Sequence, residues 1–382
     1  DKFREVHWTR LPTSAAAAVF AARVLALLTG ATEPARAAPR TDSLKPATAE
    51  TKSKASVVAP REPLMDWRPA PDQIVPGTQW ILERKLGEGG FGEAWLGRHQ
   101  TMKERRVFKF CFREERVRSL KRELTLFRVI KERVGGHLNI VRLLDVHFNE
   151  PPFYVEMDFV DGQDLKSWCA QQGGVEKVPL NVRLEIVAQI ADALHAAHTA
   201  GVIHRDVKPG NILVSRPATP GAQPAAKLSD FGIGQVVSEE ALSGVTKSGF
   251  TQSIVVDSSA VRSGTQMYMA PELLAGEPAS TRTDLYSLGV VLFQLVVGDM
   301  HRPLTTDWSR AVDDPLLCED LTRCFARRQE ERFASADLLA QSLRTFEQRR
   351  AAYAKEQTAA ALRQRTAGRW KLFRTVGIAA VV

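Results

Sequence analysis

The chain has 382 residues, of which 44% are hydrophobic and 25% charged, and this composition fits a globular protein rather than a chain that is disordered throughout. Its formal net charge is +8, but many of the cations lie after residue 348, where few carboxylates offset them. Because the middle of the chain is mixed in sign, we expect no nucleic-acid partner. The four cysteines show no C-x-x-C spacing, which favours a reducing compartment over a disulfide-linked secreted domain.

Residues 1–76 are rich in Ala, Pro, Thr and Ser, and they end in a proline-studded run that cannot build a continuous core. We therefore expect a disordered extension over 1–76. Within it, Ala15–Leu28 is similar to the apolar region of a signal peptide. Arg23 interrupts that region, so secretion is the less favoured alternative.

The next part of the chain, residues 77–160, predicts a small sheet with one main helix. A strand, a glycine loop and a second strand lie between Trp80 and Leu96. Further strand-type apolar runs occur at Val107–Phe112, Ile140–Phe148 and Phe153–Val160. Between them, Arg116–Lys131 carries apolar residues at helical spacing.

The following residues, 161–347, are predicted to be mainly helical. Long apolar or amphipathic stretches lie at Leu184–His198, Leu285–Val297 and Ala334–Phe346. The predicted fold class is therefore α+β, with a small β-rich first lobe and a larger, mainly α second lobe.

The last part, residues 348–382, predicts a basic, Ala-rich helix that runs into the apolar segment Val376–Val382. This segment is shorter than the roughly 20 residues that a membrane span needs. Two alternatives stay open at this point: a membrane span that continues past Val382, or a basic tail that enters no membrane.

A glycine-rich loop and a lysine are the first residues that suggest chemistry. Gly87–Gly92 forms a G-x-G-x-x-G loop between two predicted strands, where missing side chains let backbone N–H groups approach a polyphosphate. A tight hairpin without a ligand would explain the loop equally well. Lys109 lies on the next predicted strand, where its burial needs a partner such as Glu123 on the following helix. A lysine on a solvated strand edge is the alternative.

The segment Val202–Leu213 is much more specific. It places Asp206, Lys208 and Asn211 within six positions between two apolar β-type stretches, as a base, a phosphate clamp and a metal ligand would require. A random polar loop has a negligible chance of reproducing this pattern.

Further motifs follow in order along the chain. They are Asp230-Phe231-Gly232, Ala270-Pro271-Glu272, Asp284 before a long helix, and Arg332. With these motifs the sequence resembles the eukaryotic-type protein kinases from about Trp80 to Phe346. The resemblance implies a bilobal protein-kinase-like fold with a catalytic domain over residues 77–347.

The resemblance also implies catalytic roles. Lys109 would hold the α- and β-phosphates of ATP and pair with Glu123, while Asn211 and Asp230 would bind Mg²⁺, with Mn²⁺ as an alternative. Asp206 would orient the hydroxyl of the substrate, and Lys208 would stabilise the charge of the transferred phosphoryl group. The nucleotide-binding residues implied by the family pattern are Gly87, Glu88, Gly89, Gly90, Phe91, Gly92, Ala94, Lys109, Met157, Asp158, Val160 and Asp164. By the same pattern Met157 would lie at the back of the adenine pocket, and the backbone of Asp158 and Val160 would bond adenine. Asp164 would meet the ribose hydroxyls, or it could equally cap the helix that begins near Leu165.

Lys208 and Thr265 resemble the serine/threonine branch, and Val202–Leu213 is similar to its bacterial members. The implied activity is transfer of the γ-phosphate of Mg-ATP to protein serine or threonine hydroxyls in signalling. The basic tail is similar to the juxtamembrane linker of those members, which implies a cytoplasmic catalytic domain with a membrane anchor. Arg205 implies regulation through a phosphorylated activation segment, Asp230 to Glu272, whose phosphate would pair with that arginine. We expect this segment to be self-phosphorylated, by self-association of two copies. The candidate acceptors are Thr246, Thr251, Ser258, Ser259 and Ser263.

Two rival functions stay open from the sequence. A pseudokinase would bind nucleotide without transferring phosphate, but such proteins usually lack one of the lysine or aspartate groups found here. A small-molecule phosphotransferase of related fold is the second rival. Against it, Thr265, Glu272 and Arg332 together match the platform that binds protein substrates.

Overall fold

The computed structural model describes residues 67–379, except 90–91, 123, 217–221 and 232–264. The predicted extension therefore lies outside the described residues up to residue 66. All the described residues belong to one compact unit of the chain.

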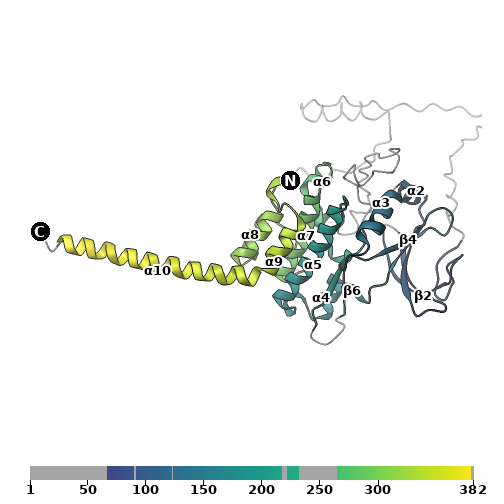
Figure 1. Cartoon of the computed structure of the whole chain (residues 1–382), viewed down its shortest axis with the longest axis horizontal. Coiled ribbons are helices and arrows are strands. Elements are labelled where there is room, and N and C mark those ends of the chain that lie inside the picture. Colours follow the sequence, from purple (N-terminus) through teal and green to yellow (C-terminus); the bar gives the residue numbers. More distant parts are fainter. Residues whose placement is uncertain (1–66, 90–91, 123, 217–221, 232–264, 380–382) are drawn as a thin grey trace, which may run out of the picture. The chain divides into compact units, whose positions relative to one another are not determined.

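A five-stranded antiparallel sheet forms the first part of the described chain, with the strand order β1-β2-β3-β5-β4 (Figure 1). Its strands are β1 (Trp80–Glu88), β2 (Glu93–His99), β3 (Arg105–Phe110), β4 (Leu143–His147) and β5 (Tyr154–Asp158). The register places Lys109 between Ala94 on β2 and Val155 on β5. Lys109 therefore lies on the central strand, and the alternative of an edge position is wrong.

The helical segment between β3 and β4 is less regular than the single helix that its spacing predicts. It consists of α2 (Glu114–Arg122), α3 (Leu124–Val129) and a π-helical turn over Ile130–Val134. Leu120 and Phe127 are buried, as their helical spacing predicts. Gly135 ends the π turn, and its N–H donates to the carbonyl of Ile130 at 2.8 Å.

Residues Trp67–Val75, which we call the strap, lie along β1. Val75 N–H donates to the Trp80 carbonyl at 2.9 Å, and Leu82 N–H donates to the Gln73 carbonyl at 2.8 Å. Pro76 and Gly77 form the turn between the two segments, and the φ of 74° at Gly77 is the conformation that a type II turn requires at its third position.

The strap corrects the predicted start of the folded domain at residue 77. Val75 is fully buried in the same cluster as Trp80 and Leu82, so residues 67–76 are part of the folded lobe. The proline-rich composition led to the wrong boundary because the prolines of this segment lie beside residues that still pair with β1.

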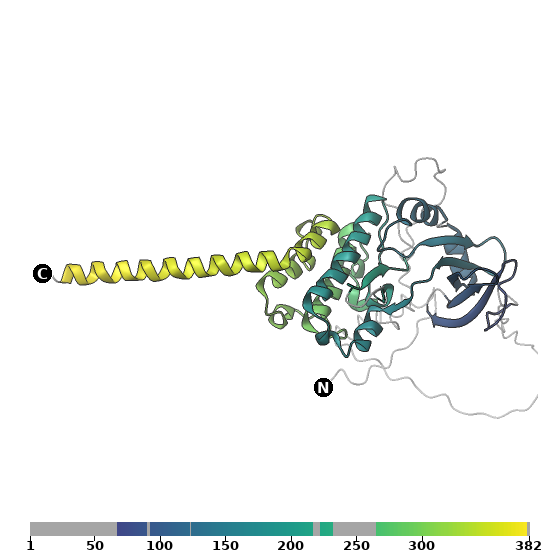
Figure 2. The ribbon, with the colours of Figure 1, turned by 60° about the horizontal axis from the view of Figure 1, so that its bottom comes forward.

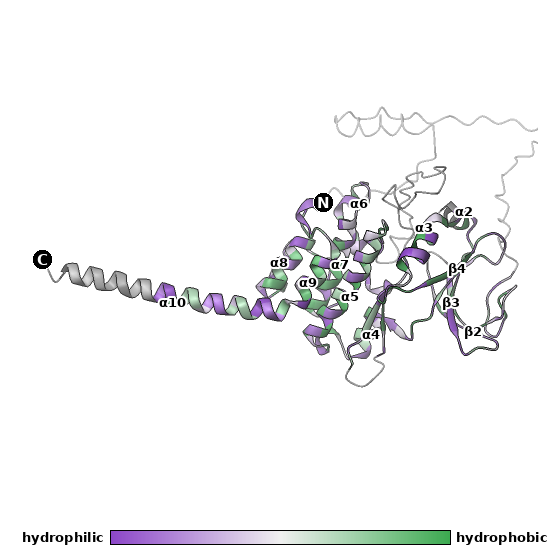
Figure 3. Ribbon diagram, in the orientation of Figure 1, coloured by the Kyte–Doolittle hydropathy of each residue, from purple (hydrophilic) through white to green (hydrophobic). Residues whose placement is uncertain are grey.

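Helices dominate the second part of the chain, as predicted (Figure 2). They are α4 (Leu165–Gln171), α5 (Leu180–Thr199), α6 (Pro271–Leu274), α7 (Thr281–Val297), α8 (Pro315–Cys324), α9 (Ala336–Arg344) and α10 (Phe346–Ala379). A small sheet of order β6-β7-β8 accompanies them, with β6 (Gly162–Asp164), β7 (Ile212–Ser215) and β8 (Ala225–Leu228). Most side chains of α7 are buried, and the hydrophobic colour of this helix in Figure 3 agrees with its place in the core.

The basic helix α10 begins beside α8 and α9 and then runs away from the other helices (Figures 1 and 2). Arg349 pairs with the buried carboxylate of Asp320, and the Arg350 Nε lies 3.4 Å from Asp314 Oδ2. These ion pairs hold the first turn of α10 on α8. In the described part of the chain, none of the helices has an apolar stretch long enough to cross a membrane.

A buried ion pair joins α6 to the segment before α9. Arg332 Nη1 and Nη2 donate to the two oxygens of Glu272 at 2.7 and 2.8 Å, and Thr283 Oγ1 donates to Glu272 at 3.0 Å. Burial tends to raise the pKa of the Glu272 carboxyl, but the bonds from Arg332 outweigh this and hold the pKa below its ordinary value. The pair therefore stabilises the fold above the ordinary pKa of a glutamate, and this stabilisation is lost as the pH falls through the lowered pKa.

We expect Arg332→Met to lower the free energy of unfolding at pH 7 by about 3–5 kcal/mol, because it leaves the Glu272 carboxylate buried without its cation. Denaturant unfolding of the full chain measures this change. Arg328→Met is the matched control, since Arg328 forms only exposed pairs with Glu330 and Glu331 and its loss should leave the midpoint almost unchanged. Equal effects of the two substitutions would contradict the role of the buried pair.

Candidate active site

The predicted base Asp206 lies at the centre of a group of polar contacts. Lys208 Nζ lies 2.8 Å from Asp206 Oδ2, and Asn211 Nδ2 donates to the same oxygen at 3.0 Å and to the Asp206 carbonyl at 2.7 Å. The other carboxylate oxygen, Oδ1, is buried and has no hydrogen-bond partner among the described residues. An unpaired buried oxygen costs free energy, so its retention calls for a functional explanation.

Asp284, near the start of α7, holds the backbone that precedes Asp206. Its fully buried carboxylate accepts from the His204 N–H at 2.8 Å and from the Arg205 N–H at 2.7 Å, and it lies 2.8 Å from His198 Nε2. Arg205 adopts a φ of 68°, in a region that residues other than glycine rarely occupy. The bonds of Asp284 to two successive N–H groups support this conformation. The sequence identified Asp284 only as a mark of the central helix, because no spacing rule connects positions so far apart.

His204 connects the loop of Asp206 to the segment that leads to Asp230. Its Nδ1 accepts from the Asp206 N–H at 3.3 Å, so Nε2 carries the proton and donates to the Ser229 carbonyl at 3.0 Å. Ser229 N–H in turn donates to the Asn211 carbonyl at 2.8 Å. These bonds bring the Asp230 segment to the side of Asn211.

Lys109 and Asp230 form a direct ion pair between Nζ and Oδ1. Burial tends to raise the pKa of the Asp230 carboxyl, but the attraction and hydrogen bond of Lys109, with the charge of Lys208, outweigh it. The pKa of Asp230 therefore lies below its ordinary value, and the carboxylate stays ionised at neutral pH. The predicted partner of Lys109, Glu123, lies outside the described residues, so their pairing stays a prediction.

Asn211 and Asp230 fit the predicted site for a divalent cation. Both amide hydrogens of Asn211 are used on Asp206, which turns the amide oxygen Oδ1 away from that carboxylate. An amide oxygen and an ionised carboxylate are hard oxygen ligands of the kind that Mg²⁺ and Mn²⁺ prefer. The donor chemistry thus agrees with the predicted metal-binding role.

The glycine loop joins β1 to β2 and closes on itself. Gly89 N–H donates to the Gly92 carbonyl at 2.9 Å, and Gly92 N–H donates back to Gly89 at 3.1 Å. A Cβ atom at Gly92, whose φ is 140°, would lie 2.0 Å from the Phe110 carbonyl, so only glycine fits there. At Gly87 and Gly89 an added Cβ would meet nothing within 4 Å, so the described neighbours leave space beside the backbone there.

Two other predicted residues of this loop are described. Ala94 faces Lys109 across the strands, and Glu88 forms an ion pair of 2.7 Å with Lys85. Gly90 and Phe91 lie outside the described residues.

The predicted adenine-binding segment includes the last two residues of β5 and continues after the strand. Met157 is buried near the end of β5, and Val160 is half-buried against the main core. The Asp158 N–H already donates to the Arg142 carbonyl at 3.0 Å, so a purine would meet only the carbonyl of Asp158. Asp164 accepts from the Ser167 N–H at 3.1 Å and caps α4, so the capping alternative is confirmed, whereas its contact with ribose stays a prediction.

The end of the activation segment is held on α7 by a buried amide that the sequence did not single out. Gln294, which is fully buried, accepts from the Tyr268 hydroxyl at 2.9 Å and donates to the Arg302 carbonyl at 3.2 Å. Thr265 begins the short 3₁₀ turn that contains Tyr268. The predicted phosphate acceptors between residues 246 and 263 lie outside the described residues.

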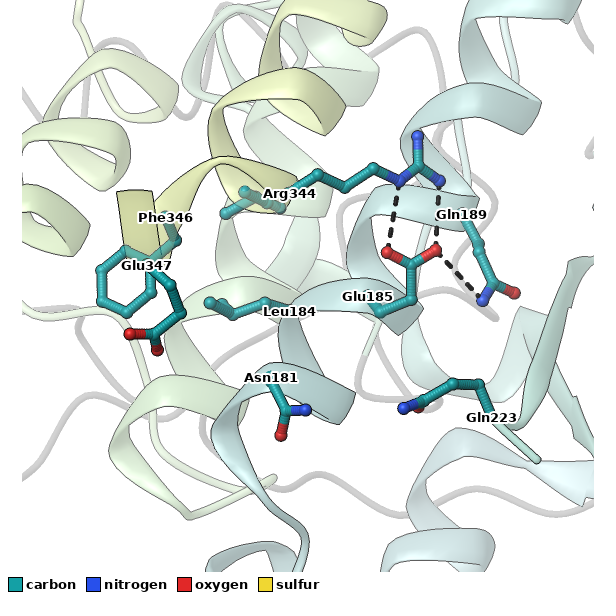
Figure 4. Close-up of a pocket in the computed structure, with 9 residues that line it drawn as sticks. Asn181, Leu184, Glu185, Gln189, Gln223, Arg344, Phe346 and Glu347 are labelled. Atoms are coloured by element: carbon teal, nitrogen blue, oxygen red, sulfur yellow. Dashed lines mark hydrogen bonds and ion pairs between the residues drawn. The ribbon is translucent and has the colours of Figure 1, made fainter. Parts of the chain in front are cut away.

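A pocket of about 360 Å³ lies elsewhere, between α5 and the junction of α9 with α10 (Figure 4). Arg344 borders it and donates to Glu185 through two bonds of 3.2 Å, and it also bonds Asp192 at 2.6 Å. Among the described residues that line this pocket, none is a predicted catalytic or nucleotide-binding residue. Its ion pairs hold α5 and α9 together, so we assign the pocket to the packing of these helices.

Comparison with known proteins identifies the family. The protein kinase domain model matches residues 80–357. The chain is 34% identical over 226 residues to the serine/threonine-protein kinase Pkn1 of Myxococcus xanthus, a match that covers 57% of this chain and 28% of Pkn1. It is 31% identical over 292 residues to the serine/threonine-protein kinase PkaA of Streptomyces coelicolor, covering 70% of this chain and 50% of PkaA. The chain thus spans half or less of the length of these relatives.

The fold is also similar to a solved structure. A double mutant of the Mycobacterium tuberculosis PknI kinase domain matches with a TM-score of 0.53 at 24% identity, covering 72% of this chain and 98% of that domain. This agrees with the predicted bilobal arrangement of an antiparallel sheet and a helical second lobe. Kinases of this family use ATP and a divalent metal ion. The chain therefore belongs to the protein kinase family, in the bacterial branch of its eukaryotic-type serine/threonine kinases.

Proposed function

We propose that this chain transfers the γ-phosphate of Mg-ATP to serine or threonine hydroxyls of proteins. The observation that carries the proposal is the convergence of Lys109, Asp230, Asn211, Asp206 and Lys208 through a continuous series of contacts. These groups supply the two cations, the metal ligands and the base that phosphoryl transfer needs.

The residues act by position and charge. Lys109 binds the α- and β-phosphates, and the open backbone of Gly87 and Gly89 lets the glycine loop cover them. Asp206 accepts a hydrogen bond from the substrate hydroxyl through the oxygen that has no described partner, which orients the hydroxyl oxygen toward the phosphorus. Lys208, which lies beside the other oxygen of Asp206, stabilises the charge on the transferred group.

Asn211 and Asp230 would hold the metal ion, which would neutralise the charge of the phosphate oxygens. The lowered pKa of Asp230 supports this role, because the carboxylate remains ionised over the physiological pH range. Lys109 also pairs with Asp230, so this carboxylate would lie between the lysine and the metal ion.

Asp206→Asn should reduce phosphate transfer at least about 100-fold, because the amide cannot accept the hydroxyl proton. Transfer from labelled ATP to a generic protein acceptor, measured beside the thermal unfolding midpoint, tests this. Asp313→Asn is the matched control, since Asp313 is exposed and distant in the chain from every predicted site residue. Equal transfer by the wild type and the Asp206 variant, with the fold intact, would favour the pseudokinase.

A protein acceptor is preferred to a small molecule because a buried framework supports the surface beside the site. The Glu272–Arg332 pair holds the end of the activation segment on the segment before α9, and the Tyr268–Gln294 bond holds it on α7. We expect labelled phosphate on serine or threonine of a protein acceptor, and none on free sugars, choline or aminoglycosides. Exclusive labelling of a small acceptor would overturn this assignment.

We further propose that two copies phosphorylate each other within residues 232–264. An affinity-tagged Asp206→Asn variant incubated with untagged wild type and Mg-ATP should acquire phosphate on Thr246, Thr251, Ser258, Ser259 or Ser263, as mapped by mass spectrometry. The tagged variant incubated alone is the control and should stay unmodified. If phosphate appears on the wild type only, the reaction occurs within one chain.

The place of the enzyme in the cell is part of the same proposal. A basic helix such as α10 suits the cytoplasmic side of a membrane, where anionic lipids attract cations. We therefore propose that the catalytic domain is cytoplasmic and that the chain after α10 attaches it to the membrane.

A further inference from the structure

The strap contacts the strand that carries Lys109. The indole of Trp67 packs on the ring of Phe110, with 5.2 Å between ring centroids. Phe110 is fully buried and directly follows Lys109 on β3, so the two side chains point to opposite faces of the sheet. Trp67 therefore holds β3 from the face opposite to the one that presents Lys109.

Arg68 makes a second contact just beyond the end of β3. Its guanidinium carbon lies 4.3 Å from the centroid of the Phe112 ring, within the range of a cation–π interaction. Trp67 and Phe112 are both partly buried, and both pack against the main core as well as against the aromatic cluster of the sheet. The strap thus contacts Phe110 at the end of β3 and Phe112 just after it.

The same stretch of β3 supports the glycine loop. Gly92 approaches Phe110 so closely that a Cβ atom would lie 2.0 Å from the Phe110 carbonyl. The next residue, Glu93, lies 2.9 Å from Lys85 Nζ and accepts from Trp95 Nε1 at 2.8 Å. The glycine loop therefore rejoins the sheet at Gly92, in close contact with Phe110, the residue on which Trp67 packs.

Charge also connects the strap to the loop. Burial tends to raise the pKa of the Glu93 carboxyl, but the bonds from Trp95 and Lys85 and the nearby charge of Arg68 outweigh it and lower the pKa. Glu93 is thus held ionised at the foot of the glycine loop, with cations from both β1 and the strap around it.

We propose that Trp67 and Arg68 are positioning residues for the nucleotide. By packing on Phe110 and Phe112, the strap fixes the positions of Lys109 and of the glycine loop. These are the two elements that bind the phosphates. This inference rests on the proposed function, since it assigns the strap a role in that same site.

The test compares full-length variants for nucleotide affinity and stability. Trp67→Ala should weaken the Kd for Mg-ATP, measured by calorimetry, by about tenfold, as expected for the loss of a well-packed aromatic contact. The KM for ATP should rise by a similar factor while kcat falls less, and Trp67→Phe should restore most of the affinity because it keeps a ring against Phe110. Arg68→Ala, at an exposed residue, should weaken binding about threefold through loss of the contact with Phe112.

Trp308→Ala is the matched control. Trp308 is a partly buried tryptophan that packs on Phe293 and Phe325 in the helical lobe, so its loss should lower the unfolding midpoint without changing the Kd for Mg-ATP. If Trp67→Ala and Arg68→Ala bind nucleotide as tightly as the wild type, the strap is only structural and the inference fails. If the wild type itself binds no Mg-ATP, the proposed function fails, and the inference fails with it.

Discussion

The carboxylate of Asp284 is the fixed point on which the catalytic arrangement depends. It is fully buried, and a buried carboxylate is tolerated only when hydrogen bonds replace its lost hydration. Two of its donors are consecutive N–H groups of the catalytic loop, at His204 and Arg205. The core helix α7 thereby sets the backbone course that presents Asp206, and His204 extends this order to the segment of Asp230.

Ion pairs and an amide add to the order that the backbone hydrogen bonds set. Asp206 and Asp230 each have a lysine beside one carboxylate oxygen, and Asn211 connects the two segments through its side chain and its carbonyl. Each of these carboxylates is thus paired with a cation of the protein itself. Fixed charges held in this way are the kind of arrangement that stabilises a loose phosphoryl-transfer transition state.

The sequence motifs predicted which residues of the site lie together better than the hydrophobic pattern predicted the domain boundary. The strands and the long helices follow from hydrophobic period, and the Asp206 to Asn211 spacing is specific enough to predict the cluster that the fold brings together. The strap was missed because its order depends on Trp67 packing on Phe110, a contact that no local pattern reveals. The roles of Asp284 and Gln294 were missed for the same reason, since each bonds to residues distant in the chain. The π turn after α3 was also not predicted, because its five residues show no hydrophobic period of their own.

The way α10 leaves the domain has a mechanical consequence. Only Thr345 separates α9 from α10. Ion pairs to Asp320 and Asp314 fix the first turn of α10, so this end of α10 is held firmly on the domain. Its 34 residues give a rod of roughly 50 Å at 1.5 Å per residue. Because each residue also advances the helix by about 100°, deleting one residue between Arg350 and Ala379 would rotate anything attached beyond it by that angle relative to the active site. Helix α10 thus sets both the distance and the rotation of an attached segment relative to the active site.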